Sequence, residues 1–303
     1  MNQEPNVIIE KQEMNINSER RYDLEENDYL CFPIHTRHVK ISPHLYSFAD
    51  IHWHKEFELV LVTSGKMKFK VNDSDVTLHV GEGLFINARQ LHYFYSDEIT
   101  QCSFICIRFD QVLLCTAINF KGDYVDPIIN GGKPYVLLSP EVSWQEKILQ
   151  SILDINNCKG KPEAPLLIQG SLCTLWGHLF AHMEINEESE KQDDMKLTLL
   201  KDMIEYIQRN YAGRIMLEDI AGAGNVSKRT CGTIFQRYLS RTPMEVLLAY
   251  RLQKAIELLN TTDQTMLEIS QAVGFSGASY FAETFRNSFG VSPTEYRKKL
   301  RKD

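Results

Sequence analysis

Histidine and glutamate side chains at a regular spacing are the first group of residues that could do chemistry. On one β-strand His52, His54 and Glu58 would point to the same side, and His92 could approach from a neighbouring strand. Imidazole nitrogens together with a carboxylate can hold a divalent transition metal. The same side chains can instead bind a small organic effector, or the histidines can be ordinary structural residues. The sequence leaves these three interpretations open.

A second group of polar residues lies on two predicted helices in the last third of the chain and could read DNA. Gln236 can pair with adenine, and Glu283 can accept a hydrogen bond from N4 of cytosine. Phosphate contacts, which position a protein on DNA without specifying its sequence, are expected from Lys228, Arg237 and Arg241. The full set of predicted DNA-contacting residues is Lys228, Arg229, Thr230, Gly232, Thr233, Gln236, Arg237, Arg241, Gly277, Ser279, Ala282, Glu283 and Arg286.

The elements that would present these DNA-reading residues occur twice. A short helix, a glycine-containing turn and a helix over Lys228–Leu239, capped by Ser227, form a helix-turn-helix pattern. A second copy follows at an offset of 49 to 50 residues. Each copy is followed by a capping box with proline at the first helical position, at 242–245 and 292–295. A connecting helix over Pro243–Leu259 would span roughly 26 Å, which suits two recognition helices about one DNA turn, ~34 Å, apart.

This repeated unit resembles the DNA-binding domain of the AraC/XylS family of bacterial transcription regulators over roughly residues 196–300. The resemblance implies a sequence-specific DNA-binding regulator, more commonly an activator, that works with RNA polymerase. In the first turn Asn225 replaces a common glycine. Thr233 and Glu283 stand where many members carry a base-reading arginine, so the target sequence does not follow from relatives. The motifs that carry the resemblance are Ile269, Gly274-Phe275, Ser279-Tyr280-Phe281, Phe285, Gly290, Ser292-Pro293 and Tyr296-Arg297, with Arg251 and Ala255 in the connecting helix.

Short segments bounded by turn residues predict an antiparallel barrel or sandwich from Tyr29 to about Phe109. The segment from Ile51 to Glu58, followed by Gly65, resembles the first cupin motif, and Gly81-Glu82-Gly83 with His92 resembles the second more loosely. This resemblance implies a cupin-like effector domain. The strands are expected at 58–63, 66–71, 76–80, 84–86, 91–95 and 103–109. In metal-dependent cupins the ligand positions correspond to His52, His54, Glu58 and His92. The aromatic residues that either line the cavity or belong to the core are Trp53, Phe85, Tyr93 and Phe94.

Two further helices, Glu141–Asn156 and Pro165–Glu184, would form a hairpin. One interpretation is a dimer interface, and the other is packing on the barrel's own surface. The expected buried stripe of the second helix consists of Leu167, Leu172, Leu175, Leu179 and Met183. The predicted organisation is a mobile tail at 1–28, a cupin-like sensor barrel at 29–140, the helical hairpin at 141–185, an acidic linker at 186–195 and an all-α DNA-binding domain at 196–303.

Charge and composition agree with this organisation. The 303 residues carry a net charge of −7. Residues 195–303 hold 16 Lys and Arg against 11 Asp and Glu, a net of +5, which leaves 17 against 29, a net of −12, for the rest. A basic C-terminal third favours an anionic partner such as double-stranded DNA. No apolar run approaches the ~20 residues of a membrane helix, and a polar N-terminus argues against a signal peptide. We therefore expect a cytoplasmic protein without a membrane partner.

The sequence thus predicts a transcription regulator of multidomain fold, an all-β cupin-like barrel with a helical hairpin followed by an all-α double helix-turn-helix domain. We expect it to activate transcription, to form a homodimer and to respond to a small-molecule effector in the barrel. It should not be an enzyme and should require no cofactor, although a divalent transition metal is possible. The alternatives are a metal-dependent cupin enzyme fused to a DNA-binding domain, and a regulator that is gated by a protein partner.

Overall fold

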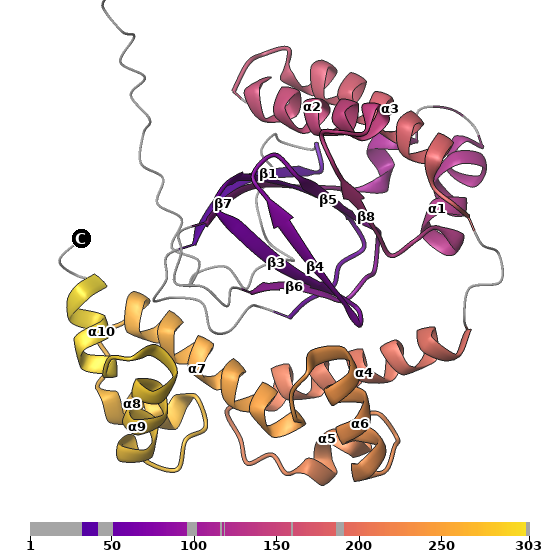
Figure 1. The fold of residues 1–303 in the computed structure, drawn as a ribbon. Helices are drawn as coiled ribbons and strands as arrows, with labels where there is room; N and C mark the ends of the chain where they lie inside the picture. The colour runs from indigo at the N-terminus through magenta and orange to yellow at the C-terminus, as the bar shows by residue number, and fades with distance from the viewer. Residues whose placement is uncertain are drawn as a thin grey trace, which may run out of the picture.

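The computed structural model describes residues 32–41, 51–95, 102–115, 117, 119–158, 160–185 and 191–300. The tail expected at 1–28 lies outside these residues. A β-domain occupies the centre of Figure 1, with a pair of helices on one side and the helical C-terminal region on the other. Among the described helices, none is both long and apolar enough to cross a membrane.

The β-domain consists of two antiparallel sheets that face each other, as the alternating strands predicted. The larger sheet has the order β1-β7-β2-β5-β8, and the smaller one has the order β4-β3-β6. Two of the strands, β1 and β8, were not among the strands expected from the sequence. The strands are β1 (Ile34–Ile41), β2 (Phe57–Ser64), β3 (Lys66–Val71), β4 (Ser74–His79), β5 (Gly83–Ile86), β6 (His92–Tyr95), β7 (Cys102–Phe109) and β8 (Tyr135–Leu138).

The two faces of β2 enter different hydrophobic cores. Val60 and Val62 point between the sheets and pack with Met67 and Phe69 of β3. Phe57, like the other odd-numbered core residues of β2, points to the opposite side, where the helices lie. Because side chains alternate along a strand, one sheet can support both cores.

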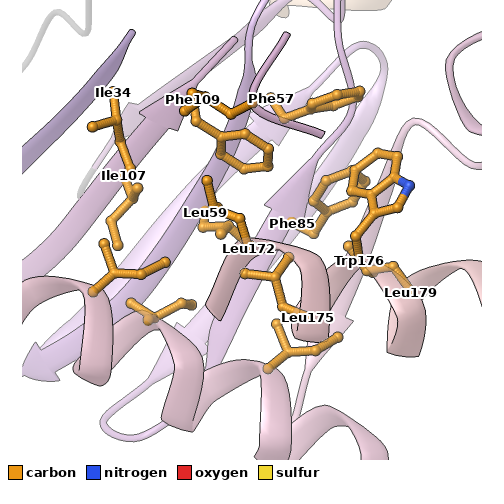
Figure 2. Packing of buried hydrophobic residues seen from close by; sticks show 14 of the residues in the cluster. Ile34, Phe57, Leu59, Phe85, Ile107, Phe109, Leu172, Leu175, Trp176 and Leu179 are labelled. Carbon is orange, nitrogen blue, oxygen red and sulfur yellow. The ribbon is translucent and has the colours of Figure 1, made fainter. Parts of the chain in front are cut away.

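The helical hairpin packs on the outer face of the larger sheet (Figure 2). Trp176 lies against Phe57, with ring centroids 4.6 Å apart, and its indole nitrogen donates to the carbonyl of Tyr124 at 2.9 Å. This is the second of the two expected arrangements, and the dimer interface remains a prediction. Leu167 was expected on the buried stripe but is 48% exposed, and Ile168 is buried instead. The helices here are η2 (Gln111–Leu114), the π-helical η3 (Lys121–Val125), α1 (Asp126–Gly131), α2 (Ser143–Cys158) and α3 (Ala164–His182).

The C-terminal region contains two helix-turn-helix units, each with its own core. Residues from α4 to the start of α7 form the first core, and residues from α7 to α10 form the second. Helix α4 begins at Lys191, so the C-terminal half of the segment expected as a linker at 186–195 is helical. Asn225 has a positive φ of 50°, the conformation expected at a turn position where glycine is common. The helices are α4 (Lys191–Asn210), α5 (Leu217–Ala223), α6 (Lys228–Leu239), α7 (Pro243–Thr261), α8 (Met266–Ala272), α9 (Ala278–Phe289) and α10 (Pro293–Leu300).

Helix α7 holds the two units together. The guanidinium of Arg251 donates to the carbonyls of Tyr211 at 2.8 Å and Gly213 at 2.7 Å, which anchors α7 to the loop after α4. Gly274 lies beside the same loop with a φ of +82°, and a Cβ there would meet the carbonyl oxygen of Tyr211 at 2.5 Å. A side chain at this position would therefore push the second unit away from the first.

Gly83 offers a test of the packing between the larger sheet and α2. A Cβ at this position would lie 2.5 Å from the carbonyl oxygen of Val60 and 2.7 Å from Leu149. Gly83→Ala should therefore lower the free energy of unfolding by about 1–3 kcal/mol. As a control, Gly170→Ala on α3 has open space for its Cβ and should stabilise by up to about 1 kcal/mol. Chemical denaturation measures both variants, and equal effects would contradict this packing.

Candidate functional site

The structure brings His52, His54, Glu58 and His92 together at one end of the β-domain. Each offers a ligand atom, and these atoms all lie within 4.8 Å of one another. Glu58 is on β2 and His92 begins β6, while His52 and His54 precede β2 rather than lying within it. An isolated β-bridge pairs His52 with His92 through two backbone hydrogen bonds of 3.2 and 2.9 Å. We call these four residues the polar cluster.

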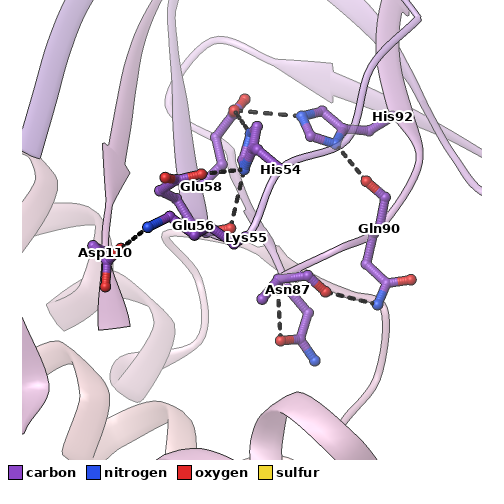
Figure 3. Close-up of polar contacts among 9 residues, drawn as sticks. His54, Lys55, Glu56, Glu58, Asn87, Gln90, His92 and Asp110 are labelled. Atoms are coloured by element: carbon purple, nitrogen blue, oxygen red, sulfur yellow. Dashed lines mark hydrogen bonds and ion pairs between the residues drawn. The ribbon is translucent and has the colours of Figure 1, made fainter. Parts of the chain in front are cut away.

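Backbone carbonyls orient two of the imidazole rings (Figure 3). Nδ1 of His54 lies 3.1 Å from the carbonyl oxygen of Glu56, and Nδ1 of His92 lies 2.9 Å from that of Gln90. A carbonyl oxygen only accepts hydrogen bonds, so both Nδ1 atoms must carry a hydrogen. The Nε2 atoms face Glu58 Oε2, at 3.1 Å for His54 and 3.4 Å for His92. Nε2 of His92 is buried and has no hydrogen-bond partner.

Burial and charge determine the protonation of the polar cluster. Burial lowers the pKa of His54 below its ordinary value, although the hydrogen bond to Glu58 opposes this effect. Burial alone would raise the pKa of Glu58, but the attraction of His92 and the hydrogen bond with His54 outweigh it and hold the carboxyl pKa well below its ordinary value. The polar cluster therefore favours an ionised carboxylate and a neutral His54 near neutral pH.

Sequence reasoning missed two neighbours of the polar cluster on β7. Arg108 pairs with Glu58 across the sheet and is 6% exposed, and Cys106 pairs with Val60. Burial, reinforced by the charge of Glu58, raises the pKa of the Cys106 thiol well above its ordinary value. The alternation of side-chain direction along β7 could have shown that Cys106 and Arg108 share a face, because Ile107 between them points to the other face. What the sequence does not give is the register that places this face beside Glu58.

The four aromatic residues expected either to line the cavity or to belong to the core pack against hydrophobic cores. Trp53 and Tyr93 pack against the first helix-turn-helix core, Phe85 packs against the hairpin, and Phe94 packs between the sheets. The β-domain therefore rests on the first unit (Figure 1). In this interface the ammonium of Lys201 donates to the carbonyl of Arg89 at 2.6 Å, and the hydroxyl of Tyr93 lies 3.5 Å from the carbonyl of Leu239.

The two recognition helices expose the same pattern of positions. On α6 Thr233 and Gln236 are exposed, and on α9 Glu283 and Arg286 are exposed at an offset of 50 residues. Tyr280 was expected to be structural but is 54% exposed, because the start of α9 turns this side chain outward. The other predicted DNA-contacting residues differ in exposure. The exposed ones are Lys228, Arg229, Thr230, Arg237 and Ser279. The half-buried ones are Gly232, Arg241, Ala282 and Gly277, the N-cap of α9.

Predicted phosphate contacts already take part in ion pairs within the chain. Lys228 lies 2.7 Å from Glu218 on α5. Arg237 lies 3.1 Å from Asp73, which belongs to the turn between β3 and β4. Salt bridges between exposed side chains are weak, so such pairs can open when DNA offers a phosphate.

Comparison with known proteins identifies both halves of the chain. Residues 39–200, more than half of the chain, match the family described as the AraC-like ligand binding domain. Residues 220–299 match a helix-turn-helix domain family. The chain belongs to the AraC family of transcription regulators. It combines a ligand-binding domain with a DNA-binding helix-turn-helix domain, as the sequence predicted.

Relatives of this AraC-family regulator extend over most of its length. The uncharacterized HTH-type transcriptional regulator YdeC of Bacillus subtilis (strain 168) is 29% identical over 91% of this chain and 95% of its own length. The HTH-type transcriptional activator RhaS of Mannheimia succiniciproducens is 25% identical over 81% of this chain and 88% of its own length. A solved structure of ToxT from Vibrio cholerae is 13% identical, covers 88% of this chain and 98% of its own, and has a TM-score of 0.46.

The pKa of His54 predicts how stability depends on pH. Because the folded state lowers this pKa from its ordinary 6.5, it favours the neutral ring. The stabilisation is complete above the ordinary value and is lost as the pH falls below it. With a chelator present, the melting temperature should fall as the pH is lowered from about 7.5 to about 5.5. His54→Gln should flatten this dependence and His79→Gln, which changes an exposed histidine, should not. An unchanged pH profile in His54→Gln would contradict the assignment.

Proposed function

We propose that this regulator activates transcription and that an occupant of the polar cluster controls its binding to DNA. The observation that carries the proposal is the position of the polar cluster directly behind the interface with the first helix-turn-helix unit. His52 and His92 face the polar cluster, while the adjacent Trp53 and Tyr93 face that unit. A shift of the side chains in the polar cluster therefore reaches the domain interface through a single layer of backbone. An occupant that binds one domain arrangement more tightly shifts the population toward it.

Helices α6 and α9 would enter successive major grooves on one face of the duplex. Helix α7, at 19 residues, spans about 28 Å, close to the ~34 Å of one DNA turn. Gln236 and Glu283 would read bases, while Lys228, Arg237 and Arg241 would contact phosphates. The further partners we propose are RNA polymerase and a second copy of the chain, in the cytoplasm where bacterial DNA lies. A relative named as an activator supports the direction of control.

Hydrogen bonding in the polar cluster favours a cation as its occupant. If His54 is neutral, the hydrogen on Nδ1 leaves Nε2 with a lone pair directed at the Glu58 carboxylate, which also only accepts. The orphaned Nε2 of His92 faces the same carboxylate. Protonated rings would supply the missing hydrogens, but burial opposes a charge on His54. A metal ion would take the place of the proton through which His92 attracts Glu58, and it would satisfy both imidazole nitrogens and the carboxylate at once.

The donor set also fits a divalent transition metal in kind, and two of its pairs fit in spacing, while the ligand atoms of the four residues lie up to 4.8 Å apart. Metal–nitrogen bonds of about 2.1 Å place neighbouring ligand atoms roughly 3.0–3.4 Å apart. The two His–Glu58 separations of 3.1 and 3.4 Å match that range. The carbonyls that accept from Nδ1 of His54 and His92 hold the rings in the tautomer that a metal ligand needs. We therefore propose such a metal as the occupant, with an organic effector as the other outcome of the test.

Base reading by α6 and α9 predicts separable changes in DNA preference. Gln236→Ala and Glu283→Ala should each relax the preference at different base positions, about one helical turn apart, with a cost of about 1–3 kcal/mol against the preferred base. Lys228→Ala should weaken binding to all sequences and lower the salt dependence of log K by about 0.9. Randomised-site selection followed by titration measures both effects. Recovery of one motif by the wild type and both base-reading variants would contradict these roles.

Metal occupancy predicts a matched pair of histidine variants. Purified wild-type protein should hold a stoichiometric transition metal by elemental analysis. His54→Ala should weaken metal binding by more than the roughly 10- to 100-fold that loss of an outer-sphere partner costs, and His79→Ala should leave it unchanged. Removal of the metal by a chelator should change the affinity of wild-type protein for its DNA but not that of His54→Ala. Metal-free wild-type protein that instead responds to an organic molecule would favour the organic effector.

A further inference from the structure

The turn between β3 and β4 reaches the first recognition helix. At the tip of this turn, Oδ2 of Asp73 lies 3.1 Å from Nη2 and 3.3 Å from Nε of Arg237 on α6. Figure 1 shows the β3–β4 hairpin pointing from the β-domain toward α6. The contact joins residues that are 164 positions apart in the sequence, so it exists only when the β-domain is docked on the first unit. We call this ion pair the clasp.

A carboxylate oxygen that accepts two guanidinium N–H groups resembles the way a DNA phosphate is held. Resting on the function proposed above, in which Arg237 contacts a phosphate, we infer that Asp73 occupies the place of that phosphate. Arg237 cannot direct the same N–H groups to DNA while the clasp is closed. The negative Asp73 would also lie beside the DNA backbone and repel it. The docked β-domain therefore competes with DNA for one anion-binding group of α6.

The position of Asp73 is fixed by its neighbour in the turn. Asn72 adopts a left-handed conformation with a φ of 52°. Its side-chain Nδ2 donates to Oε1 of Gln90 at 2.8 Å, and its Oδ1 accepts from the backbone N–H of Leu91 at 3.1 Å. The backbone N–H of Asn72 donates to the carbonyl of Leu91 at 2.8 Å. The turn is therefore anchored to residues 90–91 and does not move independently of them.

The same short segment reaches the polar cluster. The carbonyl of Gln90 accepts from Nδ1 of His92 at 2.9 Å, and the N–H of Arg89 donates to the carbonyl of His54 at 2.7 Å. The carbonyl of Arg89 in turn accepts from Lys201 of α4. Residues 89–92 thus connect the polar cluster, the interface and the clasp, so a shift of the His92 imidazole or of the His54 backbone displaces the anchor of the Asp73 turn.

The test is the affinity of the full chain for a fluorescently labelled duplex that carries the selected target sequence. Both partners of the clasp are about two-fifths exposed, and exposed ion pairs change an equilibrium by about 1.4- to 5-fold. Asp73→Asn, which keeps a residue suited to a turn, should tighten DNA binding by that factor. In an Arg237→Gln background, which weakens binding by itself, Asp73→Asn should have no further effect. Thermal melts verify that each variant is folded.

Asp123→Asn is the matched control, because it removes the same charge from an exposed aspartate of η3, which adjoins α1. An equal gain from Asp123→Asn, or a gain from Asp73→Asn that persists with Arg237→Gln, would show a general charge effect and overturn the clasp. No gain from Asp73→Asn would overturn it as well. If neither the wild type nor Asp73→Asn binds any duplex, the proposed function itself fails, which is a different result from equal binding by both.

Discussion

Successive side chains of an extended segment point to opposite sides, and the arrangement of the β-domain depends on this constraint. On β2, Glu58 faces the interior between the sheets while Phe57 supports the helical hairpin. Beside it, His52 and His92 face the polar cluster while Trp53 and Tyr93 face the DNA-binding region. The polar cluster, the hairpin core and the domain interface are therefore built on the same few backbone segments.

Building these three regions on shared segments places a charged group beside an apolar core. The interior between the sheets is apolar over most of its extent, and the ionised Glu58 lies at one end of it. A buried carboxylate is costly unless charged and hydrogen-bonding groups surround it. Here Oε2 of Glu58 lies 3.1 and 3.4 Å from Nε2 of His54 and His92, and Nε2 of His92 has no hydrogen-bond partner. The incomplete pairing supports the proposal that the polar cluster binds an occupant.

The two helix-turn-helix units differ in what they share with the β-domain. Leu91 is buried in the core of the first unit, and the aromatic rings of Trp53 and Tyr93 pack against that core. The core of the second unit is built from α7 to α10 with a contribution from Tyr211. The β-domain can thus act directly on the first unit, while α7 and its Arg251 anchor carry any change to the second.

Local patterns in the sequence were enough for the family and for most elements, although they missed the strands β1 and β8. Ser227 caps α6, and the boxes at Thr242 and Ser292 start α7 and α10, because capping depends on residues within one turn of the helix. The repeat offset placed both recognition helices, and the parity of His52, His54 and Glu58, with His92 added, picked out the polar cluster. The prediction that Tyr280 is structural was wrong, because the type of residue at the start of a helix does not determine whether its side chain points to the core or to solvent.

Only the tertiary structure decided the contacts between distant residues. The register of β2 with β7 places Arg108 beside Glu58, and hydrophobic packing of the hairpin against the sheet, rather than any local motif, orients α2 and α3. The clasp between Asp73 and Arg237 depends on how one domain docks on another. No local spacing encodes such pairs, because their energies arise only when the chain has brought together distant segments, such as Asp73 and Arg237, which are 164 positions apart in the sequence.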